Sequence, residues 1–416
     1  MSELLDAATQ YHLAGDGVAR AAVRSALVVR HALQPFSPAA FGAPLVDEEA
    51  SEPRRFSFDA RWRAAAEEPA GVATLPAFAP TLLSRAVDPG AALSIDRLRS
   101  ALMRPHAAYL QGSLGLRLPE EEPPLLEHEP FGAAEPLARH ALRSAVFERW
   151  LAARARPDPR VLHARLLARA LVAPGPDGLA TVEQVLEEVD PFVQCALREG
   201  LGVDAPSLPL AQVAGERLLQ GTLGGIQRPA SQDAGVLRVA LRPEGRHGGQ
   251  ALRHGLDWLL ASLHGLPLLE LAAANKDEAP VLRRRAPLSR EDAIASLQAL
   301  VELREQALQS PLPFLPRSGF VHFQQLDAGQ AKARQKGEAA DIEALRRMAL
   351  ERACAEWCGD AQRKRADAGP ATRLALRGRD PFIDGDAPNR ARFARIAEAL
   401  FGAFEHGRVL RAEALR

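Results

Sequence analysis

The sequence is poor in lysine and has no excess of charge of either sign. Only four of its 52 basic residues are lysine, and its acidic residues also number 52. A free-standing, non-specific nucleic-acid binder usually carries a clear basic excess, so this balance argues against that class. Arginine abundance of this kind is typical of a GC-rich genome, and arginine counts alone do not indicate a binding site.

Long apolar runs are lacking too. No uncharged apolar run reaches the roughly 18 residues that predict a membrane span. Residues 1–6 have neither the basic region nor the apolar region of a signal peptide. We therefore expect a cytoplasmic protein with no membrane partner. Its 416 residues, 47% hydrophobic and 25% charged, are enough for two or three compact units.

Cysteine is scarce, and the three cysteines fit a reducing compartment. Cys354 and Cys358 are four residues apart on a predicted helix and could share a metal ion. A four-ligand zinc or iron–sulfur site, however, needs more thiolates or histidines than this segment supplies. We interpret both as small buried hydrophobic residues.

Residues 216–274 carry the most informative pattern. They predict, in order, a strand, a second strand, a helix and a third strand, over residues 216–227, 235–242, 250–264 and 266–274. In the second strand Leu237, Val239 and Leu241 are spaced two apart, which predicts one buried face. Leucines recur every three or four residues in the helix, and the last strand is almost wholly apolar, as expected of a strand buried on both faces. This order resembles the heart of a restriction-endonuclease-like nuclease fold, which is of the α/β class.

A working nuclease of this type needs an acidic residue on one strand. On the next strand it needs a second acidic residue, followed two positions later by a lysine. The acids hold a divalent metal ion through oxygen ligands, and the lysine stabilises charge on the phosphate. Here residues 221–224 read Gly-Thr-Leu-Gly and residues 237–239 read Leu-Arg-Val, and neither stretch supplies a magnesium ligand. We predict a PD-(D/E)XK-type, restriction-endonuclease-like core with lost catalytic residues, wrapped by many α-helices, with no catalytic residue and no metal site.

A helix predicted over residues 137–155 opens an arginine-rich stretch. Residues 137–170 contain eight arginines and two acids. One stripe of the helix combines guanidinium groups with an aromatic ring, and its members are Arg139, Arg143, Trp150 and Arg154. Such a stripe suits contact with DNA phosphates or a partner protein, because arginine stacks on aromatic rings and pairs with oxyanions. A solvated arginine face is an equally open interpretation.

A basic triplet, Arg283, Arg284 and Arg285, follows the last predicted strand at a predicted loop position. Binding residues concentrate in loops, so the triplet is a candidate phosphate contact. Most charge runs of three residues are simply solvated, and that alternative stays open.

Residues 31–41 contain two prolines three apart, which predict an extended segment. Phe36 and Phe41 are expected to anchor it to a neighbouring surface, and we interpret it as an interdomain linker in preference to a ligand site. We predict three parts: N-terminal helices with this extended segment over residues 1–57, a nuclease-like domain over residues 58–326, and a C-terminal helical segment over residues 327–416.

Several of these stretches resemble, in the same order, the C-terminal part of the gamma subunit family (RecC) of exodeoxyribonuclease V, the RecBCD helicase–nuclease. Residues 31–41 are similar to that family's His-Pro-Leu-Gln-Pro-Phe-Ser-x-x-Phe segment, with Ala32 in place of proline. Further similarities, in chain order, lie at Arg104-Pro105, residues 114–116, residues 129–131, Gly221, Trp258, residues 311–317 and residues 357–359.

The resemblance implies a non-catalytic role in ATP-dependent repair of double-strand breaks and homologous recombination. Such a domain would brace the complex, guide double-stranded and single-stranded DNA, and dock the beta (RecB) and alpha (RecD) subunits. This chain would bind no cofactor, while magnesium and ATP would be used by the partner subunits. The family's larger N-terminal part, similar to an inactive helicase, has no counterpart here, so we do not expect hotspot recognition by this chain alone.

Two alternatives remain open. A divergent metal-dependent DNA nuclease could use acids elsewhere in the core, and the candidates are Asp233, Glu244 and Glu270. A remnant that folds but binds nothing would associate with neither DNA nor partners.

Overall fold

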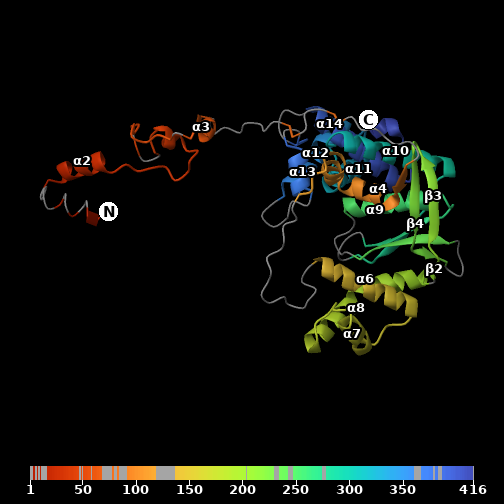
Figure 1. Ribbon diagram of the computed structural model, residues 1–416. Coiled ribbons are helices and arrows are strands. Elements are labelled where there is room, and N and C mark those ends of the chain that lie inside the picture. Colours follow the sequence, from red (N-terminus) through yellow and green to blue (C-terminus); the bar gives the residue numbers. More distant parts are fainter. Residues whose placement is uncertain are drawn as a thin grey trace. The chain divides into compact units, whose positions relative to one another are not determined.

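The computed structural model describes residues 3–4, 7, 10, 16–45, 48, 50–57, 59–67, 77–78, 82–83, 91–118, 136–202, 204–228, 234–241, 247–273, 278–359, 367–377, 380–382 and 387–415. Contacts divide the chain into two compact units, residues 1–74 and 75–416. Figure 1 labels many of their helices and strands. No described helix is both long enough and apolar enough to cross a membrane. The domain boundaries predicted near residues 57 and 326 stay predictions.

The N-terminal unit buries few apolar side chains. Its described elements are α2 (Gly17–Leu27), the 3-10 helix η1 (Pro38–Phe41) and α3 (Ala60–Glu67). Among its described residues, the buried apolar ones are Ala39 and Ala66, whereas Leu33 is 96% exposed and Phe36 is 46% exposed. The unit therefore presents large apolar side chains to solvent.

The segment predicted to be extended over residues 31–41 is helical at its C-terminal end. The hydroxyl of Ser37 accepts a hydrogen bond from the Ala39 N–H at 3.3 Å, and Pro38 supplies the fixed φ angle that favours a first helical position. The prediction of an extended conformation is therefore wrong for η1. Phe36 lies beside Trp62, with their ring centroids 6.1 Å apart, but it remains exposed.

The larger unit contains two sheets that share one bent hairpin. The three-stranded sheet has the order β1-β4-β3, and the five-stranded sheet has the order β2-β5-β6-β7-β8. Their bounds are β1 (Ala92–Ser94), β2 (Asp204–Ala205), β3 (Leu208–Ala214), β4 (Arg217–Leu223), β5 (Ile226–Gln227), β6 (Gly235–Ala240), β7 (Leu268–Ala272) and β8 (Val281–Arg285). β3 pairs with β4 and β2 pairs with β5, both antiparallel. Each arm of the hairpin therefore passes from one sheet into the other.

The hairpin bends at Gly224 and Gly225. Gly225 has a φ of +73°, in the left-handed region that favours glycine. The single strand predicted over residues 216–227 is therefore wrong, because the glycine pair divides it into β4 and β5. Apolar residues occur on both sides of the glycine pair, Leu219 and Leu223 before it and Ile226 after it, so the sequence did not show where one strand ends and the next begins.

The predicted strand–helix–strand order that follows is confirmed. β6 leads through α9 (Gly248–Ser262) to β7, and β6 and β7 pair in parallel, with Arg238 opposite Glu270. β8 then adds an antiparallel edge strand. The chain is thus a mixed α/β protein, as predicted.

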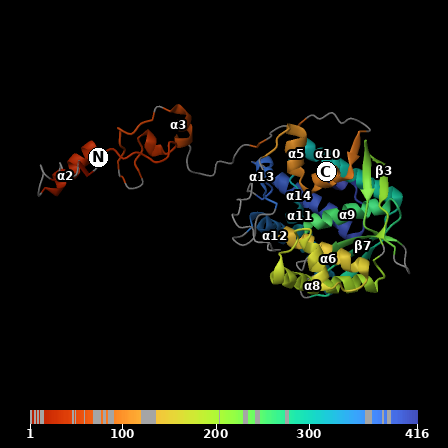
Figure 2. The same cartoon turned by 60° about the horizontal axis from the view of Figure 1, so that its bottom comes forward.

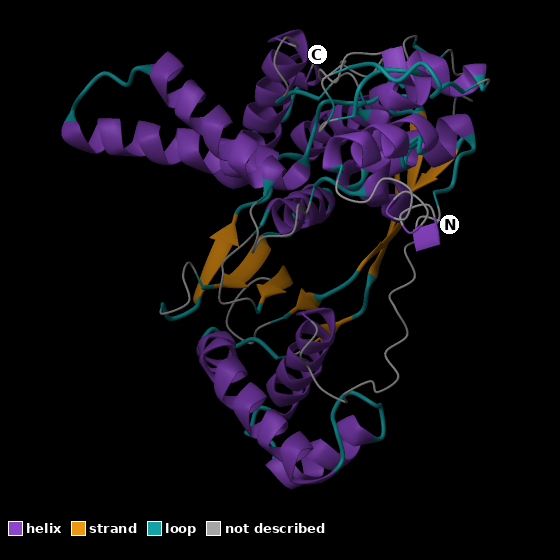
Figure 3. Ribbon diagram, turned by 90° about the vertical axis from the view of Figure 1, so that its left-hand side faces the viewer, coloured by secondary structure: helices purple, strands orange, loops and turns teal. Residues whose placement is uncertain are grey.

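Helices cover both faces of the five-stranded sheet (Figures 2 and 3). On one face lie α6 (Pro136–Ala153), α7 (Pro159–Leu167) and α8 (Gly175–Arg198), and Leu237 and Leu269 pack with their side chains. On the other face Val236 and Leu268 pack with α9. The prediction of one buried face for β6 is therefore wrong, because both faces are covered.

The remaining helices extend the layer that contains α9. They are α4 (Ile95–Met103), α5 (Pro105–Leu114), α10 (Arg290–Gln309), α11 (Pro316–Lys336), α12 (Ile342–Cys358), α13 (Pro370–Ala375), α14 (Ala387–His406) and the 3-10 helix η2 (Ala412–Leu415). α10 contacts α4, α5 and α9, while α11 contacts α9, α12 and α14. The sheets are wrapped by many helices, as the sequence predicts.

Candidate functional site

The two stretches predicted to replace nuclease catalytic motifs lie against each other. Arg238 on β6 extends its guanidinium to the bend of the hairpin, where Nη1 donates to the Gly224 carbonyl at 3.1 Å and to the Leu237 carbonyl at 2.8 Å. A Cβ atom at Gly225 would come within 2.4 Å of the same Nη1, so the bend leaves room for the arginine because it lacks a side chain. The place where the nuclease pattern calls for acids thus holds a cation.

Asp257 of α9 neutralises that cation. Its Oδ2 accepts from Arg238 Nε at 2.7 Å, and its Oδ1 accepts from Arg99 Nη2 of α4 at 2.9 Å. Asp257 is only 5% exposed. Its two oxygens are each used by an arginine, so this buried carboxylate ties α4, α9 and β6 together and is not free for a metal ion.

Glu270 on β7 is the centre of a second buried ion cluster. Its Oε1 accepts from His254 Nδ1 at 2.7 Å, and its Oε2 accepts from Arg285 Nη2 at 2.8 Å. Arg285 also donates to the Phe404 carbonyl and lies over the Trp258 ring, 5.4 Å from its centroid. Of the alternative nuclease acids, Glu270 is thus held in the interior, while Asp233 and Glu244 lie outside the described residues.

No metal cluster accompanies these acids in the part of the chain that the structure describes. No group of three or more His, Cys, Asp or Glu side chains there is arranged to hold an ion. Cys354 and Cys358 have their sulfurs 3.9 Å apart, but Cys354 is partly exposed and Cys358 is exposed. Their interpretation as buried hydrophobic residues is wrong, because neither cysteine is buried.

Three of the four residues in the predicted stripe of α6 contact α8 and are not fully exposed to solvent. Arg143 Nε donates to Glu188 Oε2 of α8 at 2.6 Å, and Arg139 pairs with the other oxygen of the same carboxylate. Trp150 is 1% exposed, in the core between α6 and α8. These three residues join two helices of one layer.

Arg154 is the exposed member of the stripe. It follows the last residue of α6 and has a φ of +55°, which ends the helix. Its neighbour Arg156, which the stripe did not include, lies over the Trp150 ring at 5.5 Å and pairs with Glu187. The spacing along the helix did not show this pairing, because it depends on how α8 packs.

The basic triplet is part of a strand. Arg283, Arg284 and Arg285 form the end of β8, so the predicted loop position is wrong; pairing with β7 orders this segment. Arg283 and Arg284 are exposed, whereas Arg285 points into the cluster around Glu270. The triplet is therefore divided between the surface and the core.

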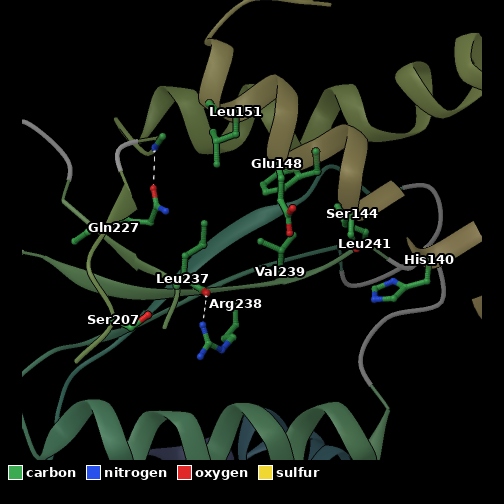
Figure 4. Close-up of a pocket in the computed structure, with 15 residues that line it drawn as sticks. His140, Ser144, Glu148, Leu151, Ser207, Gln227, Leu237, Arg238, Val239 and Leu241 are labelled. Carbon is green, nitrogen blue, oxygen red and sulfur yellow. Dashed lines mark hydrogen bonds between the residues drawn. The ribbon is translucent and has the colours of Figure 1, made fainter. Parts of the chain in front are cut away.

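A cavity of about 530 Å³ lies between β6 and α6, on the face of the five-stranded sheet that α6 covers. His140, Ser144 and Glu148 of α6 line it together with residues of β5 and β6 (Figure 4). Figure 4 shows Leu237 and Val239 directed towards α6 and Arg238 directed away from it. The sequence does not indicate this cavity, because its lining comes from segments far apart along the chain.

The family model of the RecC C-terminal domain matches residues 90–327, more than half of the chain. The match includes both sheets and helices α4 to α10. The chain belongs to the RecC C-terminal domain family. RecC is the gamma subunit of exodeoxyribonuclease V, and membership assigns the chain to the RecBCD complex of DNA repair and recombination. The resemblance seen in the sequence is thereby confirmed. No curated protein matches the chain.

Proposed function

We propose that this RecC-family chain is a non-catalytic part of exodeoxyribonuclease V that guides DNA and docks the catalytic subunits. The observation that carries the proposal is the ion pair between Arg238 and Asp257. A magnesium-dependent nuclease needs carboxylate ligands that are open to an ion. Here the guanidinium of Arg238 lies where the nuclease pattern calls for an acidic residue, and it pairs with the carboxylate of Asp257. Cleavage, magnesium and ATP then belong to the partner subunits, and this chain binds no cofactor.

We further propose that the larger unit has a restriction-endonuclease-like core. A restriction-endonuclease-like core is supported by the order of β5, β6, α9 and β7 and by the helical layers on both faces of the sheet. The meeting of residues 221–224 with Arg238 also supports it, since a nuclease of this type would bring its two acidic motifs together there.

Exposed apolar side chains support the docking role. Leu33, Phe36 and Phe56 of the N-terminal unit are all exposed, and large apolar side chains at a surface favour contact with another protein. We propose the beta and alpha subunits as the partners.

The DNA-guiding role is proposed for the exposed arginines Arg154, Arg283 and Arg284. Charge reversal of the last two, R283E/R284E, is expected to weaken binding of duplex and single-stranded DNA. The logarithm of the DNA-binding constant is also expected to fall less steeply with the logarithm of the salt concentration, because fewer phosphates are neutralised. The matched control, R160E/R165E, changes the same charge on exposed positions of α7. Equal losses in both variants would contradict a role for β8 itself.

Co-expression tests the assignment as a whole. The tagged chain is produced with the beta and alpha subunits of the same genome and recovered at moderate salt. A stoichiometric complex is expected. Failure to recover either subunit with a folded, soluble chain would contradict the docking proposal.

A nuclease assay separates this proposal from the enzymatic alternative. The purified chain is mixed with end-labelled linear DNA and magnesium, and no loss of label is expected. Magnesium-dependent loss that disappears in a folded Glu270→Gln variant would favour a divergent nuclease over our proposal.

A further inference from the structure

The segment beyond the family match contains a groove between two helices. α12 and α14 both pack on α11, and a space of about 760 Å³ lies between them. The apolar part of its lining, here called the floor, is mostly small and consists of Leu350 of α12, Ala391, Ala394 and Ala399 of α14, and Ala414 of η2. Small side chains allow the backbone of another element to approach closely. The family match ends at residue 327, before α12 begins.

The rim of this groove is positively charged. Arg346, Arg390 and Arg395 line it together with one carboxylate, Glu398. That carboxylate is already neutralised, because Arg346 Nη2 reaches it at 2.7 Å and His322 Nε2 of α11 at 3.1 Å. Although burial raises the pKa of Glu398, these hydrogen bonds outweigh it and hold the pKa below its usual value, so the group stays ionised.

We propose that the groove between α12 and α14 binds an amphipathic helix with acidic flanks, supplied by a partner protein of the complex. Two helices that share a third leave a furrow that a further helix fills at the usual interaxial distance of about 8–10 Å. The apolar stripe of the incoming helix packs on the alanine floor, and its carboxylates meet the arginines of the rim. This proposal rests on the docking role proposed above and names its surface.

A nucleic-acid strand fits the groove less well. Strand-binding grooves combine positive charge with aromatic side chains on which bases stack. Among the described residues that line this groove none is aromatic, and those of its floor are all apolar. Carboxylates presented beside an apolar stripe match both surfaces.

The test uses the co-expressed complex and two groove variants. Ala394→Trp fills the floor, and Arg395→Glu reverses an exposed charge without touching the core. The matched controls are Ala355→Trp and Arg352→Glu, at exposed positions of α12 outside the groove. Recovery of the partner subunits is measured for each, with amide hydrogen exchange of residues 342–358 and 387–406. Binding of a fluorescent oligothymidine to the chain is measured in parallel.

Both groove variants are expected to lower recovery of the complex at least tenfold, while the controls match the unsubstituted chain. Amides of α12 and α14 are expected to gain protection in the complex. Unchanged recovery with both groove variants would overturn the proposal that the groove binds a partner helix, but would leave the docking role of the chain standing. Failure of the unsubstituted chain to assemble would overturn both. Loss of oligothymidine binding in Arg395→Glu, with recovery unchanged, would make the groove a nucleic-acid site and also overturn the proposal.

Discussion

Asp257 is a single carboxylate on which two guanidinium groups converge. Removing one partner of a buried ion pair leaves the other charge without compensation, which costs about 3–5 kcal/mol. Arg99 and Arg238 are partly exposed, which reduces the penalty. We expect Asp257→Ala to lower the free energy of unfolding by about 3 kcal/mol in urea titrations.

Asp96 supplies the matched control for that substitution. It pairs with Arg99 at the surface, so Asp96→Ala is expected to change stability little. Similar losses for both variants would mean that the buried cluster around Arg238 is not what holds α4, α9 and β6 together.

His106 gives the chain a specific dependence on pH. Burial lowers the pKa of its imidazole to about 4, even though its Nε2 lies 2.7 Å from the Leu312 carbonyl. His106 takes up a proton near pH 6.5 in the unfolded chain but only near pH 4 in the folded chain. The stability that comes from burying the neutral imidazole is therefore fully present above pH 6.5 and is lost as pH falls towards 4.

Replacing His106 should remove this dependence. The free energy of unfolding of the unsubstituted chain is expected to fall by about 2 kcal/mol more than that of His106→Gln between pH 7 and pH 5. Glutamine keeps a donor for the Leu312 carbonyl. Parallel curves for the two proteins would show that His106 titrates normally.

At the scale of elements, α11 depends on a residue some fifty positions further along the chain. Its preceding residue, Leu315, provides no side-chain cap. Instead, Asp367 accepts from the Ser318 N–H at 2.7 Å and from the Ser318 hydroxyl at 2.9 Å. Since α12 and α14 pack on α11, this distant cap supports the whole C-terminal group of helices.

The cap can be measured with a double-mutant cycle. Asp367→Ala is expected to cost about 1–2 kcal/mol of unfolding free energy, as helix N-caps do. Combined with Ser318→Ala, the costs should be less than additive, because both residues serve the same interaction. Strict additivity would show that the two side chains act independently.

Local patterns predicted those elements whose own residues determine them. The apolar repeat of α9 and the continuous apolar run of β7 were both predicted from periodicity, as was their order. What failed depends on distant partners: β8 is a strand because β7 pairs with it, and Trp150 is buried because α8 covers it. The site was predicted in part: the sequence showed an arginine, and no acid, at position 238. The pairing of Arg238 with Asp257 could not be predicted, because it depends on how α9 packs on β6.

At the scale of the whole molecule, the two units have very different cores. The clusters of buried apolar residues lie within residues 75–416, and the N-terminal unit buries alanines alone among its described apolar side chains. A chain of residues 75–416 is therefore expected to unfold cooperatively within about 3 °C of the midpoint of the 416-residue chain, in thermal melts followed by circular dichroism. A much lower midpoint would show that residues 1–74 contribute to that core.

The bent hairpin connects the sheets mechanically. Its two arms, β2 with β3 and β4 with β5, each run through both sheets, so a load applied to the three-stranded sheet reaches the five-stranded sheet along two covalent paths. Arg238 is hydrogen-bonded both to the Gly224 carbonyl at the bend and to Asp257 of α9, so movement at the bend would strain one of these two interactions. We therefore expect this ion cluster, together with the two chain connections, to resist relative movement of the sheets.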